Sequence, residues 1–277
     1  NNIIEDFVRS SNKESFIREF HRDMSPTPDD RPYFFKFSKW SQLFSTKKNI
    51  DEPTFISQGN PFFIFGQLLL STILAISFIL LPILFFKRKG ISRAYLKPFL
   101  IYFAGLGLGF IFIEIALMQK LVLFLGHPLY SITVTLFSML IFAGIGSLLS
   151  DRWFRELTVC SWFVPVGLAV FLGLFIIFSP QMVNSWIIWP KFARILVTIG
   201  ILAPISMLLG VPFAYGIRLL NQFNPTIIPW AWAVNGCMTV IGSILTVILS
   251  MNIGFNFVLV IAILTYFISF FVIRDLS

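Results

Sequence analysis

Seven long apolar stretches determine what this chain can fold into. Each holds about 20 residues or slightly more, which at 1.5 Å per helical residue matches the roughly 30 Å hydrocarbon core of a bilayer. They cover residues 62–86, 98–119, 128–149, 159–179, 193–214, 230–250 and 254–273. Backbone groups in lipid have no water to bind, so spanning segments are helices or closed barrels. Because no stretch alternates strictly between apolar and polar residues, the sequence predicts an all-α fold, a polytopic membrane bundle of about seven transmembrane helices.

The composition supports the same class. Hydrophobic residues make up 57% of the 277 residues and charged residues 12%, whereas soluble domains average about 45–50% and about 25%. The formal charge of +8 would by itself suggest an anionic partner, but residues 1–60 carry nine basic and nine acidic side chains. The whole positive excess therefore belongs to the apolar part, and we expect a lipid bilayer as partner and no nucleic acid.

The first 60 residues differ in kind from the rest. Apolar residues recur at helical spacing over 3–8 and 13–20, which predicts two short amphipathic helices. Two such helices can hardly bury a core of their own, and the chain begins with Asn1 rather than Met. We therefore expect the natural polypeptide to extend upstream. The predicted domains are the C-terminal tail of a soluble domain plus a linker over 1–60, and a transmembrane domain over 61–277.

Basic residues are unevenly distributed between the two sides of the predicted bundle. The short loops on the side of the tail carry Lys120, Lys191 and Arg194. The opposite side carries nine, namely Lys87, Arg88, Lys89, Arg93, Lys97, Arg152, Arg155, Arg218 and Arg274. By the positive-inside rule, this bias places the opposite side in the cytoplasm and the tail outside.

Glu114 is the one acidic residue deep inside a predicted span. A carboxylate in a membrane is costly, so it suggests a site for an ion, a proton or a polar substrate. The alternative is a structural carboxyl that fixes packing by pairing with a neighbour, and Gln119 and Asn235 are candidate partners. Asn235 could equally serve as polar glue between helices.

Glycines mark close contacts between the predicted helices. Gly105 and Gly109 are four residues apart, the small-xxx-small spacing that lets two membrane helices approach closely. Together with Gly107 they do not form a dinucleotide fingerprint, because the spacing is wrong and no strand precedes them. The predicted helix-packing glycines are Gly105, Gly109, Gly144, Gly146 and Gly236.

Two other features concern helix ends and kinks. His127 directly precedes Pro128, a residue suited to a first helical turn, which favours an interfacial or capping role for this histidine over a ligand role. Pro204 and Pro212 lie in the fifth stretch, where we expect them to kink or break the helix.

The tail contains one compact polar motif, 27-TPDDRP-32, with Thr27, Asp29, Asp30 and Arg31 between prolines. Its carboxylates can form a local turn, or they can bind a cation such as a polyamine. The sequence shows no metal cluster, phosphate loop or nucleophile–base pair, and Cys160 and Cys237 lie too far apart for a Cys-based site. We expect no cofactor or metal in this chain, and its catalytic residues are unknown.

Three segments occur together in a recognisable order: residues 25–35, 105–147, and 210–220 followed by 229–243. This combination resembles the C-terminal part of bacterial membrane-integral spermidine-synthase-like proteins. In those proteins a Rossmann-type domain of the aminopropyltransferase/methyltransferase kind is fused to multi-pass membrane segments. The family's T-x-D-D-R-P motif is matched here, with Pro28 in place of its usual second threonine.

The resemblance implies a multi-pass protein of the bacterial inner membrane. It also implies that residues 27–32 end a soluble domain whose cofactor-binding and catalytic residues lie upstream. The bundle would anchor that domain and handle a polyamine-like or other small cationic product. Such a domain faces the cytoplasm, whereas the basic loops place the tail outside, so sidedness stays open. Two alternatives remain: a small-solute transporter or channel using Glu114, and a non-catalytic subunit packed against other membrane subunits.

Overall fold

The computed structural model describes residues 27–33, 61–85, 93–153 and 157–274. Its long helices are α3 (Pro61–Phe85), α4 (Arg93–Leu125), α5 (Pro128–Trp153), α6 (Leu157–Trp186), α7 (Lys191–Phe223), α8 (Ile228–Ile253) and α9 (Phe255–Arg274). A short 3-10 turn, η3 (Pro225–Ile227), precedes α8. The described ranges contain no strand, and the all-α prediction is confirmed. The two amphipathic helices predicted over 3–8 and 13–20 lie outside the described residues.

The chain is a multi-pass membrane protein. Six helices, α4 to α9, are long and apolar enough to cross a bilayer. Helix α3 has 25 residues, of which Phe63–Phe78 form its described apolar part. Many large apolar side chains, such as Leu148 and Ile188, lie exposed on the outside of the bundle, as expected where lipid replaces water.

Several helices extend beyond the apolar stretches from which they are predicted. Helix α4 runs from Arg93 to Leu125, whereas the apolar stretch covers 98–119. Helix α6 likewise continues to Trp186. Hydropathy marks only the uninterrupted apolar run, whereas backbone hydrogen bonding continues past the polar residues that interrupt it, such as Lys120 in α4.

Of the kink or break predicted for the fifth stretch, the break is wrong. Helix α7 is continuous from Lys191 to Phe223 with Pro204 and Pro212 inside it. A proline removes only one helical hydrogen bond, and neighbouring helices can hold the helix together around it. Here α7 packs along α5 and contacts α4, and the Tyr102 hydroxyl donates to the Pro212 carbonyl at 2.7 Å.

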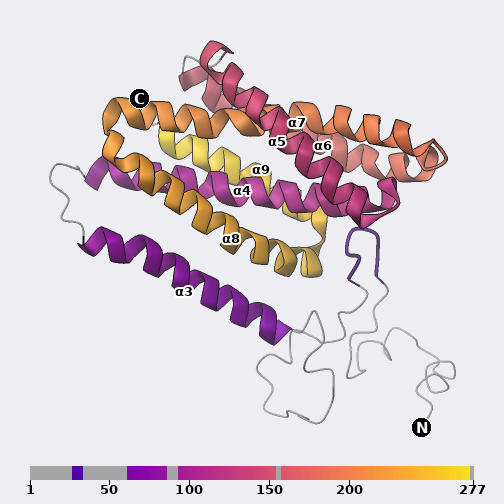
Figure 1. Ribbon diagram of the computed structural model, residues 1–277, viewed down its shortest axis with the longest axis horizontal. Helices are drawn as coiled ribbons and strands as arrows, with labels where there is room; N and C mark the ends of the chain where they lie inside the picture. The colour runs from indigo at the N-terminus through magenta and orange to yellow at the C-terminus, as the bar shows by residue number, and fades with distance from the viewer. Residues whose placement is uncertain (1–26, 34–60, 86–92, 154–156, 275–277) are drawn as a thin grey trace, which may run out of the picture.

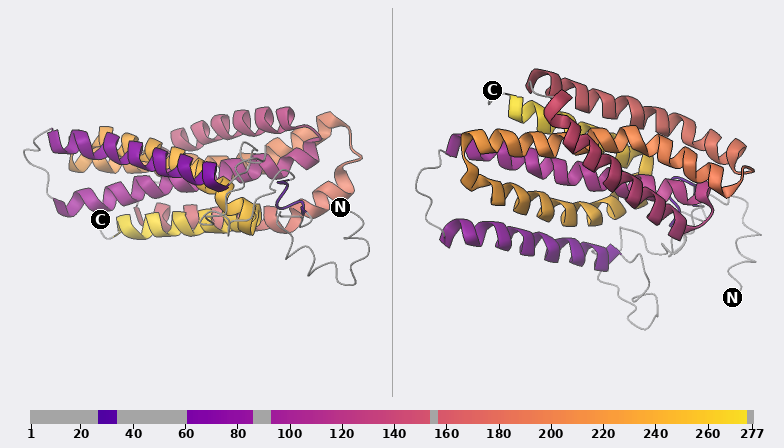
Figure 2. Two further views of the ribbon diagram at one scale, coloured as in Figure 1. Left: turned by 90° about the horizontal axis from the view of Figure 1, so that it is seen from below. Right: turned by 45° about the horizontal axis from the view of Figure 1, so that its top comes forward.

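Helix α4 forms the centre of the bundle. It packs against α8, α9, α5 and α7. Half of the residues in its most apolar segment are buried inside the bundle, against 22% of those in the corresponding segments of α5 and α8. Figures 1 and 2 show α3 at the edge, along α8 only and away from the other helices. Tyr102 and Phe103 of α4 belong to a buried aromatic cluster in which Phe103 meets Phe213 of α7.

Several glycines lie where helices touch. A side-chain carbon added at Gly105 would lie 1.9 Å from Ser269 Oγ, and one at Gly109 would lie 2.6 Å from the Tyr266 ring, both on α9. Gly146 of α5 is similarly close to α7, because a side-chain carbon added there would lie 2.0 Å from the Met207 carbonyl oxygen.

The other two predicted packing glycines behave differently. Gly144 and Gly236 have no atom of another helix within 4 Å of such a carbon and lie exposed on the outer surface of α5 and α8. Neither therefore belongs to a helix contact. Each lies next to a helix contact in sequence but is turned away from it, because neighbouring residues on a helix point about 100° apart.

Candidate functional site

The tail motif, residues 27–33, lies against one end of the bundle, called here the tail end. There it meets the α8–α9 turn, residues 252–256, and the last turns of α4 (Figure 1, indigo segment). The motif itself forms a tight turn in which the Arg31 N–H donates to the Pro28 carbonyl at 2.8 Å. A motif predicted to end a soluble domain is thus packed directly onto the membrane helices.

Asp30 caps the beginning of α9. The Asn256 N–H donates to both carboxylate oxygens of Asp30, at 3.1 and 3.3 Å, and the Phe255 N–H donates to the Asp30 carbonyl at 3.1 Å. The first N–H groups of a helix have no partner within it, and a negative charge there is favoured by the helix dipole. A residue more than 200 positions away in the chain thus supplies the cap of α9.

The same carboxylate forms an ion pair with α4. Lys120 Nζ lies 2.9 Å from Asp30 Oδ1, and the two side chains are 11% and 27% exposed. Exposed ion pairs contribute little to stability, whereas removing one member of a mostly buried pair leaves a costly unpaired charge. Asp30 therefore joins α4 to α9.

Arg31 and Tyr33 bind the end of α8. The Arg31 guanidinium donates to the Asn252 carbonyl at 3.2 Å, which is one of the last carbonyls of that helix and lacks a helical partner. The Tyr33 hydroxyl hydrogen-bonds with the Ser250 hydroxyl, and its ring stacks on Phe255 with centroids 6.0 Å apart. Burial raises the pKa of the Tyr33 hydroxyl, and the bond to Ser250 offsets part of that rise.

Gly254 makes room for the motif. Its φ of +89° is a left-handed conformation that other residues rarely adopt. A side-chain carbon at this position would lie 2.1 Å from Asp30 Oδ2. The α8–α9 turn is therefore shaped both for its own sharp reversal and for close approach of the carboxylate.

The two carboxylates of the motif are not used alike. Asp30 is partly buried and paired, whereas Asp29 is exposed, as is Thr27. The structure therefore does not present the two carboxylates as a joint cation site, because one of them is occupied by Lys120.

The other basic residues of the tail end are also engaged. Arg194 donates to the Phe124 carbonyl at the end of α4, at 2.8 Å, and Lys191 Nζ lies 3.5 Å above the Tyr130 ring. His127 caps α5, since its Nδ1 accepts from the Leu129 N–H at 3.2 Å. These three side chains therefore all contact helix ends at the tail end of the bundle.

The polar residues inside the spans are dispersed along the bundle. Asn235 donates to the Phe103 carbonyl at 3.2 Å and so links α8 to α4. Gln119 is exposed. Glu114 is half-buried and makes no hydrogen bond or ion pair with any described residue. The structure does not bring these three residues together into one site.

The sequence does not predict the residues of the bundle on which the tail motif lies. The sequence predicts Lys120 only as a loop charge, and it predicts no role for Gly254 or Asn256. An isolated glycine between two apolar stretches is a detectable turn signal, but nothing in the sequence pairs it with Asp30. Searches against family models, curated proteins and solved structures find no match to this chain.

Proposed function

We propose that the helical bundle is a membrane anchor that holds the preceding, soluble part of the chain in a fixed position at the tail end. The observation that carries this proposal is the docking of residues 27–33 on three helices, α4, α8 and α9. A flexible tether would need no such contacts. The bundle thereby sets the distance and the orientation of the soluble part relative to the bilayer.

The proposal extends to the class of the soluble part. The resemblance in sequence supports a spermidine-synthase-like domain, with the bundle as its anchor in a bacterial inner membrane. Asp29, exposed beside the docked Asp30, leaves a negative group near the membrane surface for a cationic product. Isothermal titration of the natural full-length protein with spermidine tests this extension. Saturable binding supports it, and no heat at millimolar spermidine contradicts it.

The anchoring role itself is tested by cutting the linker. A protease site inserted between residues 44 and 60 allows the covalent connection to α3 to be cut in membranes. We expect the part before the cut to remain with the membrane pellet, because residues 27–33 still hold it. Lys120→Glu should release it into the supernatant, since it places two negative charges together.

Two further variants control this experiment. Lys191→Glu changes a charge at the same end that contacts Tyr130 instead of the motif, and we expect the cut fragment to stay bound. Asp30→Lys combined with Lys120→Asp restores opposite charges at the ion pair but still lacks the carboxylate that caps α9, so it should recover only part of the binding. Equal release from wild-type and Lys120→Glu membranes would refute the anchor.

A second candidate function rests on Glu114. A half-buried carboxylate inside a span, with no partner among the described residues, is the kind of group that ion and proton pathways use. If the bundle transports a small cation, Glu114→Gln should abolish uptake into vesicles while the protein still inserts and folds. Unchanged uptake would rule out this role for the carboxylate.

A further inference from the structure

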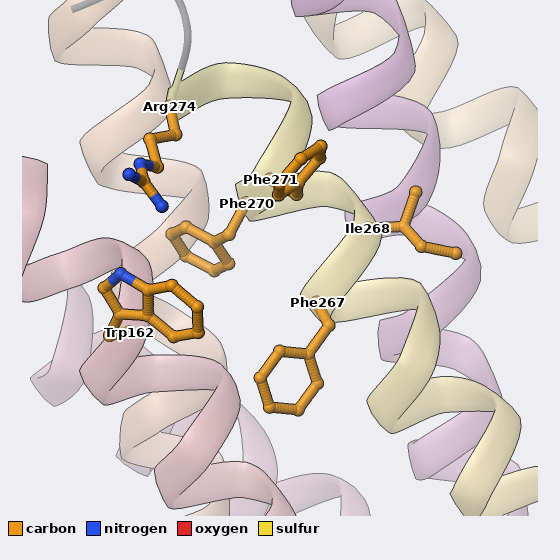
Figure 3. Close-up of a pocket in the computed structure, with 6 residues that line it drawn as sticks. All are labelled: Trp162, Phe267, Ile268, Phe270, Phe271 and Arg274. Atoms are coloured by element: carbon orange, nitrogen blue, oxygen red, sulfur yellow. The ribbon is translucent and has the colours of Figure 1, made fainter.

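A second site lies at the end of the bundle opposite the tail motif, called here the far end. There α6 and α9 line an open pocket of about 290 Å³. Figure 3 shows its lining, with Trp162 contributed by α6 and the remaining residues by α9. The lining residues are Trp162, Phe267, Ile268, Phe270, Phe271 and Arg274.

The pocket faces sideways, towards the surroundings of the bundle. Phe271, Ile268 and Trp162 are 64%, 60% and 54% exposed, whereas Phe270 is only 1% exposed and forms the inner wall. In a membrane protein this outer surface meets acyl chains. The apolar part of the pocket is therefore open to lipid.

Arg274 gives the pocket a positive rim. It is the last residue of the 20-residue span α9, so its side chain lies near the level of the lipid headgroups. Its Cζ is 6.0 Å from the centre of the Trp162 ring, and Figure 3 shows the guanidinium and the indole nitrogen on the same side of the pocket. A guanidinium binds a phosphate through two parallel N–H groups, and an indole N–H is a further donor.

The charge of the far end favours an anion. Among the described residues, this end carries one acidic residue, Asp151, against five basic ones, namely Arg93, Lys97, Arg152, Arg218 and Arg274. The negative end of the α9 dipole amounts to only about half a charge, which the full charge of Arg274 exceeds. A zwitterionic headgroup would add an ammonium to an already positive surface.

We propose that this pocket binds an anionic glycerophospholipid. The phosphate lies on Arg274 with the Trp162 indole beside it, and the upper part of one acyl chain packs on Phe267 and Phe271. Basic pockets between membrane helices that end at the interface are the usual place for such headgroups. The site is independent of the tail motif, which lies at the other end.

The proposal is tested with the purified chain in phosphatidylcholine nanodiscs, to which phosphatidylglycerol is added in steps. We expect phosphatidylglycerol to raise the unfolding temperature of the wild type in a saturable way. In Arg274→Gln the apparent affinity should fall about tenfold or more, as expected for loss of a charge-assisted bond. Arg152→Gln, which removes an exposed charge at the same end, should respond like the wild type.

Native mass spectrometry gives a second readout that does not depend on the unfolding temperature. The wild type and Arg152→Gln should retain one more phosphatidylglycerol molecule than Arg274→Gln. Equal retention by all three proteins, or equal thermal responses, would overturn the proposal. So would stabilisation of the wild type by glycerol phosphate or inorganic phosphate to the same extent, because the ligand would then be a free anion.

Discussion

Asp30 makes three interactions, two through its carboxylate and one through its backbone carbonyl. It pairs with Lys120, accepts from the Asn256 N–H and accepts from the Phe255 N–H. Loss of a helix cap costs about 0.5–2 kcal/mol, and a mostly buried unpaired Lys120 adds to that cost. A substitution at Asp30 should therefore destabilise the protein more than a substitution at a surface aspartate in a polar tail.

Replacing Asp30 by Ala, which has no side-chain acceptor, should loosen the first turn of α9. We expect the amides at the start of α9 to exchange with solvent about 10- to 100-fold faster, corresponding to about 1–3 kcal/mol of lost protection. Hydrogen exchange followed by mass spectrometry measures this directly. Asp29→Ala is the matched control, because Asp29 is exposed. Equal exchange in the two variants would show that Asp30 does not cap α9.

Gly254→Ala should displace the tail motif. The added carbon would lie 2.1 Å from Asp30 Oδ2, and the φ of +89° is strained for alanine. We expect a loss of about 1–3 kcal/mol in thermal or denaturant unfolding. Gly144→Ala has open space around it and lies inside a helix, so it should be neutral or stabilising by about 0.5–1 kcal/mol. Equal effects of the two changes would contradict this geometry.

Tyr33 makes docking sensitive to high pH. Burial raises the pKa of its hydroxyl above the ordinary value, which is about 10. The neutral phenol is therefore the docked form, so its contribution is complete below pH 10 and is lost as the pH rises through the higher pKa. The difference in tyrosinate absorbance between wild type and Tyr33→Phe isolates this titration. A midpoint at or below 10 would contradict burial of Tyr33.

Among the helices, the α4–α9 contact can be tested by adding a single carbon atom. A carbon at Gly105 would lie 1.9 Å from Ser269 Oγ, so Gly105→Ala should destabilise the bundle by about 1–3 kcal/mol. Ser269→Gly in the same chain removes the obstacle and should restore most of the loss. A double-mutant cycle of unfolding temperatures checks this, and purely additive effects would place Gly105 away from α9.

The helices themselves could be predicted from the sequence, and their contacts only in part. Apolar runs of 20 residues or more leave helix as the only open option in lipid, and for this reason every predicted stretch overlaps a helix. The spacing of Gly105 and Gly109 identifies a contact face but not its partner. Gly144 and Gly236 show the limit, because a small residue in a membrane helix contacts another helix only if its face is turned inward.

At the scale of the whole molecule, the relation between tail and bundle could not be predicted. The motif around Asp30 and the turn at Gly254 are separated by more than 200 residues, and each alone reads as an ordinary turn. Their fit depends on the backbone groups at two helix ends. The last carbonyls of α8 and the first N–H groups of α9 have no partner within their helices and bind the motif instead. Such unpaired groups exist at every helix end, so sequence alone does not say which end receives the motif.

The central claim, that the tail motif lies on the α8–α9 turn, is tested most directly by disulfide crosslinking. A carbon at position 254 would lie 3.0 Å from Asp30 Cγ, which is within the reach of a disulfide. Asp30→Cys also removes the Oδ2 atom with which a carbon at position 254 would clash. In a background with Cys160→Ala and Cys237→Ala, Asp30→Cys with Gly254→Cys should therefore crosslink rapidly under mild oxidation in membranes. Asp29→Cys with Gly254→Cys should crosslink far more slowly. Equal rates, or no crosslink at position 30, would contradict the docked arrangement.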